Sequence, residues 1–242
     1  MIFGQNTLLS RTMHDIRYDE VHDEFLVTNP FAQAIVVFRG GADGNEKPLR
    51  VIQGPHTQLQ RPDRLDVDPI HNEILVPGED RILVYPRTAN GDVAPIRVLR
   101  GPDTKLNTST LAVDPVNNLI VTSTGRGMQI FNRTDQGNVK PRAEIVGSNT
   151  GIVRINQLQV YSPKGWIIAA MPGGNGVEPE GIFVGVWSIR DNGNVAPRWK
   201  IAGPSSGMKK PRGVVLDVKH QELIVADMRL NSVLTYYFPE IF

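Results

Sequence analysis

The chain has 242 residues, enough for one large all-β domain or two small ones, and no apolar run is long enough to span a membrane. It contains no cysteine, which excludes disulfides, thiolate metal sites and cysteine nucleophiles. The 26 basic and 25 acidic residues give a net charge of +1, without the basic excess that nucleic-acid binding favours.

The first residues, Met1–Asn6, show no basic region followed by an apolar stretch, so we predict no secretory signal. The chain as written is expected to be cytoplasmic, unless it is the mature or trimmed form of a longer product. Its 23 glycines and 18 prolines suit short strands joined by turns, and no stretch keeps a helical period. We therefore expect almost no α-helix.

A repeat runs through the whole sequence. Residues 42–55 and 89–102 share a glycine turn, a proline, a β-branched run and a closing Gly-Pro; 193–204 follow the same pattern, and 137–147 follow it as far as the closing glycine. The turn glycines lie 47, 46 and 56 residues apart, at Gly44, Gly91, Gly137 and Gly193. A second anchor position counts five units, at Asp19, Asp68, Asp114, Ser162 (the exception) and Asp217.

Four strands fit each unit. In the second unit they are predicted at 64–68, 73–77, 81–85 and 95–101, separated by turns such as Asn90-Gly91. A period in the forties with four strands per period is the signature of propeller blades. We predict an all-β, five-bladed β-propeller forming a single domain over 1–242, with blades at 14–54, 62–101, 109–147, 156–203, and 212–242 plus 1–4.

The two ends of the chain favour closure of this propeller. The last unit finishes at its third strand, 232–237, and Ile2-Phe3-Gly4 precedes Asp19 much as Ile52-Gln53-Gly54 precedes Asp68. An N-terminal strand that completes the C-terminal blade would remove an exposed edge. The segment is short, so two alternatives stay open: the chain is a piece of a larger ring, or its edge pairs with another copy in a homo-oligomer.

The segment 223–236, Leu-Ile-Val-Ala-Asp-Met-Arg-Leu-Asn-Ser-Val-Leu-Thr-Tyr, resembles the NHL class of propeller repeats and the related bacterial repeats of the streptogramin-lyase-like group. The resemblance implies a propeller, in a family that spans scaffolds, ligand binders, lactonases and lyases. The other units depart from its Asp-to-Asn loop, with Thr28-Asn29, Gly78-Glu79-Asp80, Ser123-Thr124 and Pro172-Gly173. The histidine and glutamate of the lyase have no matching positions here.

Two motifs suggest chemistry but have simpler explanations. Asp-x-x-His-x-Glu occurs three times, beginning at Asp19, Asp68 and Asp217. Histidines in successive blades are too far apart for one zinc ion, so we interpret the motif as a repeated turn. Gly203-Pro204-Ser205-Ser206-Gly207 matches G-x-S-x-G, but no helix follows, as a nucleophile elbow requires. We predict no catalytic residue, metal site or cofactor.

The connections between blades and between second and third strands converge at one end of a propeller, where ligands commonly bind. Arginines from several blades would suit a carboxylate or phosphate, although they could instead pair with neighbouring carboxylates. The candidate ligand-binding residues are His14, Asp15, Asn29, Asp63, Arg64, Arg81, Arg126, Arg212, Asp227, Arg229 and Asn231.

The fourth unit has a longer loop, 171–181, with four glycines. Such a loop is either a functional flap or a tolerated insertion. Its candidate residues are Gly173, Gly174, Asn175, Glu178 and Glu180.

We therefore predict a non-catalytic recognition or scaffold propeller that binds a protein or a small anionic ligand, with no nucleic acid and no membrane insertion. One alternative is a metal-dependent, lactonase-like hydrolase or lyase with its site in the axial channel. Another is a structural subunit that assembles through blade edges.

Overall fold

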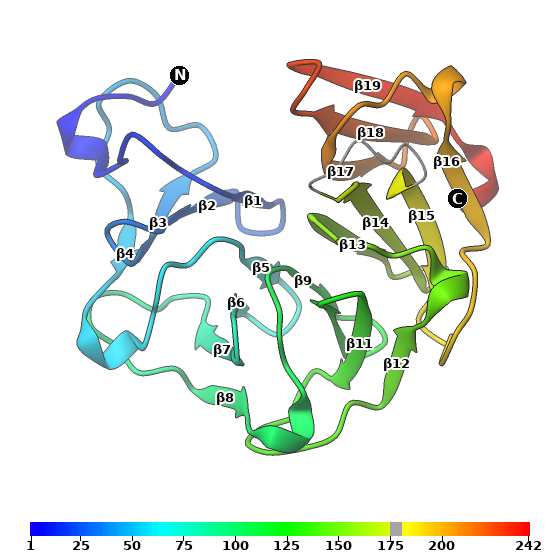
Figure 1. Cartoon of the computed structure of the whole chain (residues 1–242). Helices are drawn as coiled ribbons and strands as arrows, with labels where there is room; N and C mark the ends of the chain where they lie inside the picture. The colour runs from blue at the N-terminus through cyan, green and yellow to red at the C-terminus, as the bar shows by residue number, and fades with distance from the viewer. Residues whose placement is uncertain (175–180) are drawn as a thin grey trace. The chain divides into compact units, whose positions relative to one another are not determined.

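The computed structural model describes residues 1–174 and 181–242, which form five antiparallel sheets in chain order (Figure 1). The chain divides into two compact units, Met1–Ser109 with Asp135–Lys140, and Thr110–Thr134 with Pro141–Phe242. We call them the N-terminal and C-terminal units. The described residues contain no α-helix, only short 3-10 turns, as the sequence predicted. None of the described helices is long and apolar enough to cross a membrane.

The N-terminal unit holds two four-stranded sheets. The first is made of β1 (Ile16–Asp19), β2 (Glu24–Asn29), β3 (Ala34–Arg39) and β4 (Arg50–Ile52), and the second of β5 (Asp66–Asp68), β6 (Glu73–Gly78), β7 (Arg81–Pro86) and β8 (Arg97–Arg100). The strands of the second sheet lie within two residues of their predicted bounds. The two sheets share a buried apolar cluster in which Leu26, Ile35 and Val37 meet Ile74, Val76 and Leu83.

The C-terminal unit holds three sheets. They comprise β9 (Leu111–Asp114), β10 (Leu119–Thr124), β11 (Gly127–Asn132) and β12 (Ala143–Val146); then β13 (Gln157–Tyr161), β14 (Trp166–Pro172), β15 (Ile182–Ser188) and β16 (Trp199–Ala202); and last β17 (Pro211–Asp217), β18 (Glu222–Asp227) and β19 (Ser232–Tyr237). The last sheet has three strands, which agrees with a final unit that ends at its third strand. Whether residues 2–4 complete it stays a prediction.

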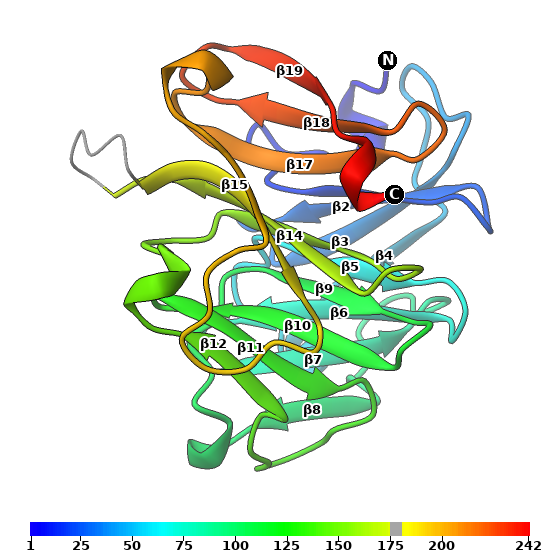
Figure 2. The same ribbon diagram turned by 90° about the vertical axis from the view of Figure 1, so that its right-hand side faces the viewer.

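The fourth sheet is buried on both faces. Alternate residues of β14 point to opposite sides, so Ile167 and Ala169 pack toward the third sheet while Ile168 and Ala170 pack toward the fifth. In Figure 2 the strand β17 lies beside β14 of this sheet. Burial of both faces explains why β14 is a continuous apolar run instead of an alternating one.

The strand register corrects one sequence assignment. Asp19 pairs with Glu24 and Asp217 with Glu222, and in the fourth sheet the equivalent pair is Tyr161 with Trp166. Tyr161 and not Ser162 therefore occupies the anchor position. Ser162 was predicted because it is polar, like the aspartates of the other repeats. The strand register depends instead on how many residues separate the anchor from the turn, and this places Tyr161 at the anchor position.

Each sheet is joined to the next by one repeated device. Gly54 and Gly101 adopt φ of 134° and 143° and each begins a 3-10 turn, η2 (Pro55–Thr57) and η3 (Pro102–Thr104). At the first three junctions the strand before the turn forms a parallel bridge to a glycine of the following repeat: Ile52 with Gly91, Leu99 with Gly137 and Ile145 with Gly193. Positive φ is strained for residues with a Cβ, which explains the glycines that recur in the sequence.

Candidate functional site

In every sheet the first strand begins, and the second strand ends, on the same side, which we call the loop end. All the candidate residues that the structure describes lie there, in the N-terminal unit (His14, Asp15, Asn29, Asp63, Arg64, Arg81) or in the C-terminal unit (Arg126, Arg212, Asp227, Arg229, Asn231, Gly173, Gly174). Asn175, Glu178 and Glu180 lie outside the described residues.

The loop end of the N-terminal unit is occupied by internal pairs. Arg64 Nη1 donates to the His14 carbonyl at 2.7 Å and lies 3.8 Å from Asp15 Oδ1. His14 Nδ1 contacts the Asp63 carboxylate. Because these groups bind one another, a ligand would have to break existing interactions to use them.

Asp15 is the most deeply buried charged group of this cluster. It is 8% exposed and accepts a hydrogen bond from the Leu65 N–H at 3.2 Å. Burial raises the pKa of Asp15, and the attraction of Arg17 and Arg64 offsets that rise only in part. Asp15 therefore binds the first sheet to the second and is a poor ligand group.

Two further candidates of the N-terminal unit are also engaged. Arg81 Nε donates to Asp80 Oδ1 at 2.8 Å, and Arg100 lies 2.8 Å from the other Asp80 oxygen. The hydrogen bond from Arg81 holds the pKa of Asp80 below its usual value. Asn29 closes its own turn by accepting the Ala32 N–H at 3.2 Å.

In the C-terminal unit Asp227 is a structural residue. One of its carboxylate oxygens accepts the N–H groups of Lys209 and Lys210 at 2.7 and 2.8 Å, and the other accepts those of Arg229 and Leu230 at 3.0 and 3.1 Å. Burial raises the pKa of Asp227, but these four donors outweigh it and the net shift is downward. The carboxylate has little capacity left for a ligand.

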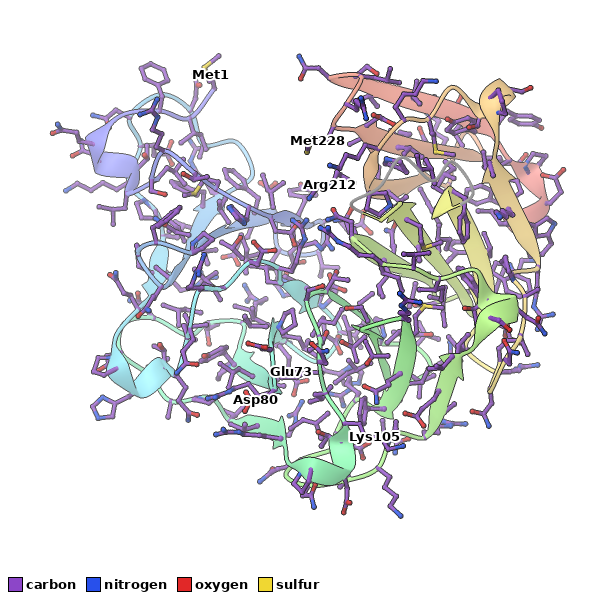
Figure 3. The ribbon with its side chains drawn as sticks, in the orientation of Figure 1. Met1, Glu73, Asp80, Lys105, Arg212 and Met228 are labelled. Carbon is purple, nitrogen blue, oxygen red and sulfur yellow. The ribbon has the colours of Figure 1, made fainter. Side chains whose placement is uncertain are left out.

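Several basic residues lie in the two chain segments that Asp227 holds together. Arg229 follows Asp227, Lys209 and Lys210 precede β17, and Met228 N–H donates to the Lys210 carbonyl at 3.1 Å, which joins these two connections. Figure 3 shows Arg212 and Met228 on the same side of the fifth sheet. With the loop-end residues of the third and fourth sheets, these side chains form what we call the cationic end: Arg126, Arg154, Lys209, Lys210, Arg212 and Arg229.

The cationic end differs from the N-terminal unit in its pairing. Arg126, Arg154, Lys209 and Arg229 are exposed, and within residues 1–174 and 181–242 none of them forms an ion pair with a carboxylate. Arg126, Arg212 and Arg229 were predicted from the sequence, whereas Arg154, Lys209 and Lys210 were not. Their position just before the first strand of a unit, where Asp63 and Arg64 had been selected, was the available signal.

Gln157 also lies at this end. Its side-chain oxygen accepts the Val214 N–H at 2.8 Å and so joins the fourth and fifth sheets. Asn231 adopts a left-handed conformation, with φ of 50°, in the turn between β18 and β19. Both residues therefore contribute to the shape of this end.

The three Asp-x-x-His-x-Glu motifs form turns. His22, His71 and His220 each contact the aspartate three residues earlier through Nδ1, at 2.7 to 2.8 Å. The same aspartates accept backbone N–H groups of the turn. Among the described residues there is no group of three or more histidine, aspartate or glutamate side chains placed to hold a metal ion.

The succession of antiparallel sheets, four with four strands and the last with three, defines the chain as a β-propeller with five blades. Hydrazine synthase from Kuenenia stuttgartiensis is similar in structure, with a TM-score of 0.61 and 10% identity over 84% of this chain and 52% of that chain. This chain thus spans about half of that protein's length. The WD40 β-propeller domain of Doa1 has a TM-score of 0.57 and 14% identity, over 95% of this chain and 70% of that chain.

These likenesses show the fold alone. No family model matches the sequence, and no curated protein matches it. The resemblance to NHL repeats stays a prediction.

Proposed function

We propose that this chain is a non-catalytic recognition propeller whose cationic end binds a carboxylate or phosphate group, carried by a partner protein or a small molecule. The observation that supports this is that Arg126, Arg154 and Arg229, at three successive sheets, are exposed and form no ion pair with a carboxylate of residues 1–174 or 181–242. Exposed guanidinium groups without a carboxylate partner can donate paired hydrogen bonds to an anion without first breaking an ion pair.

The contrast between the two units supports the same proposal. Arginines at the loop end of the N-terminal unit, such as Arg64 and Arg81, lie beside Asp15 and Asp80. In the C-terminal unit Asp227 instead accepts four backbone N–H groups, and among the described residues it forms no ion pair with the residues of the cationic end. The whole chain has a net charge of only +1, so the concentration of positive charge at the cationic end is a local feature and not a consequence of a basic composition.

The proposal is tested by calorimetric titration with citrate, inorganic phosphate and a peptide of eight glutamates. We expect the double variant Arg126→Ala/Arg229→Ala to weaken binding at least tenfold. The matched control is Arg142→Ala/Arg190→Ala, which removes two exposed arginines from the opposite side of the same unit. The control should stay within twofold, and binding should weaken as salt rises from 50 to 300 mM, because exposed charges are screened.

The probes separate the two sources of the anion. Binding of citrate or phosphate indicates a small ligand, and binding of the glutamate peptide alone indicates an acidic partner protein. Equal loss in both double variants, or no binding of any probe, would refute an anion site at this end.

A further inference from the structure

A pocket of about 350 Å³ lies at the edge of the first sheet, beside its outer strand β4. Every residue that lines it belongs to the N-terminal unit, so the pocket is complete within that unit, and none of these residues belongs to the cationic end. Small-molecule sites in proteins have volumes of about 300–1,000 Å³. The pocket is at the lower end of that range and therefore suits a small ligand.

Hydrogen bonds between separate segments of the chain fix the walls of the pocket. The Asn6 N–H donates to Asn45 Oδ1 at 2.9 Å, which holds the 3-10 turn η1 (Gln5–Thr7) against the connection that leads into β4. On the other side the Val51 N–H donates to Asn90 Oδ1 at 3.1 Å, from the connection between β7 and β8 of the second sheet. The fold itself therefore forms the pocket.

Half of the pocket is apolar. Leu8, Pro48, Leu49 and Val51 line it, and Leu8 and Leu49 are 55% and 50% exposed. Two large apolar side chains that remain this exposed can be covered by the apolar part of a ligand, which removes their surface from water.

Leu8 departs from the other repeats in a way that core packing does not explain. It follows η1 with φ of 56°, a left-handed conformation that bulky side chains disfavour. The residues at the same place after the other turns between sheets are Gln58, Lys105, Gly151 and Gly207, all of them left-handed. Of these five junctions, all within the described residues, the first alone has an apolar side chain here. Strain of this kind is often retained where a side chain has a function.

The pocket has one cation that is not already paired. Lys47 is exposed and, within residues 1–174 and 181–242, forms no ion pair. The preceding residue, Glu46, accepts two hydrogen bonds from Arg39, both at 2.6 Å. Arg50, the other basic residue of the lining, donates to the Glu24 carboxylate at 2.8 and 2.7 Å. Among the described residues that line the pocket there is no aspartate or glutamate.

We propose that this pocket binds a small monocarboxylate with a short aliphatic chain. Lys47 pairs with the carboxylate, and Leu8 and Leu49 cover the chain. The oxygen of Asn90 is bonded to Val51, which leaves its NH2 group as a further donor for the ligand. A single ammonium group balances the single charge of a carboxylate, whereas a phosphate ester carries about 1.5 to 2 charges at neutral pH.

An NMR titration of the full chain with hexanoate tests the site. We expect saturable shifts of the backbone N–H groups of residues 5–8 and 49–51. Hexan-1-ol, which has the chain without the charge, and acetate, which has the charge with almost no chain, should each bind at least tenfold more weakly. Shifts that do not saturate, or equal affinity for hexanoate and hexan-1-ol, would overturn the proposal.

Two substitutions separate the charge from the apolar wall. Lys47→Ala should weaken hexanoate binding at least tenfold, and the second repeat already has alanine, Ala94, at that place. The matched control is Lys140→Ala, because Lys140 is also exposed and also lies three residues after its turn glycine. It should change the affinity less than twofold. Equal effects of the two lysine variants would remove Lys47 from the site.

Leu8→Gln should weaken hexanoate binding at least fivefold without lowering the midpoint of thermal unfolding, because Gln58 adopts the same conformation in the next junction. A variant that unfolds like wild type and still binds hexanoate like wild type would contradict the role given to Leu8.

The site is independent of the proposed function at the cationic end, and one variant distinguishes them. Arg126→Ala/Arg229→Ala should bind hexanoate like wild type, since both arginines belong to the C-terminal unit. If this double variant weakens hexanoate binding as much as Lys47→Ala does, the carboxylate does not bind in this pocket.

Discussion

The carboxylate of Asp227 stabilises two connections at once, since it accepts N–H groups from both the segment before β17 and the turn after β18. Asp80, in the turn after the second strand of the second sheet, has a side chain that is 49% exposed and that pairs with the side chains of Arg81 and Arg100. Both aspartates lie where the second strand of a sheet connects to the third, but the groups that they bind are different. Their substitution should therefore have different effects.

We expect Asp227→Ala to lower the free energy of unfolding by about 2–3 kcal/mol, because it leaves several N–H groups unsatisfied around a buried site. Asp80→Ala should cost no more than about 1 kcal/mol, as for an exposed ion pair. Urea unfolding at pH 7 measures both. Similar values for the two variants would contradict the structural role given to Asp227.

The pair His220 and Asp217 gives a pH-dependent prediction. The hydrogen bond that His220 donates to the Asp217 carboxylate raises the pKa of His220 and lowers the pKa of Asp217. Stability from the raised histidine pKa is fully present below its unfolded value, about 6.5, and is lost as pH rises through the folded value. Stability from the lowered aspartate pKa is lost as pH falls through its folded value.

An NMR titration tests this pair directly. Asp217→Asn should move the pKa of His220 down toward its ordinary value. The matched control is Asp68→Asn, which changes the equivalent contact in the second sheet and should leave the titration of His220 unchanged. An unchanged His220 titration would show that the pair does not form in solution.

At the scale of the element, the 3-10 turn between sheets depends on one hydroxyl. Thr57 is fully buried; its Oγ1 donates to the Gly54 carbonyl at 2.6 Å and accepts the Leu59 N–H at 3.3 Å. In the last junction Ser206 makes the same two bonds, to Gly203 and from Met208, at 2.7 and 3.3 Å. Threonine and serine share the hydroxyl group but not the methyl group, so the hydroxyl is what these 3-10 turns have in common.

Thr57→Ala should lower the free energy of unfolding by about 1–2 kcal/mol, because two backbone groups lose their partner. Thr57→Ser should recover most of that loss, as the natural serine at 206 indicates. Chemical denaturation of the two variants beside wild type measures the difference. Equal destabilisation by alanine and serine would show that packing of the methyl group matters more than the hydrogen bonds.

At the scale of the whole molecule, the C-terminal tail connects the last two sheets. After β19 the chain packs Phe238 and Ile241 into the cluster shared by the fourth and fifth sheets. Phe238 meets Trp199 edge to face at 6.3 Å, and Phe242 meets Tyr161 at 5.5 Å. These contacts cover β16 and β13 of the fourth sheet.

Phe238→Ala should lower the free energy of unfolding by about 3 kcal/mol or more and change the tryptophan fluorescence of the folded chain, because it opens a cavity beside Trp199. Phe31→Ala is the control: Phe31 is 71% exposed, and its removal should change neither quantity appreciably. A silent Phe238→Ala would mean that the tail does not pack on the fourth sheet.

The sequence by itself determined the five units and the strands within them. Antiparallel neighbours such as β6 and β7 are joined by a few residues, and their alternation, turn glycines and prolines are local signals. Local pattern also identified the Asp-x-x-His turn, because Asp68 and His71 are three residues apart. Where the pattern changed, as at Tyr161, local similarity was insufficient and only the pairing register located the anchor.

The tertiary structure decided which loop-end charges are available. Arg64 and Arg126 look alike in the sequence, yet Asp15, nearly fifty residues away, neutralises Arg64 while Arg126 has no such partner among the described residues. Whether a charge is paired depends on side chains brought together from different sheets, and no local pattern encodes their distances. For the same reason, Asp227 could be selected from the sequence as a ligand group, but only its four backbone donors show that it is a structural one.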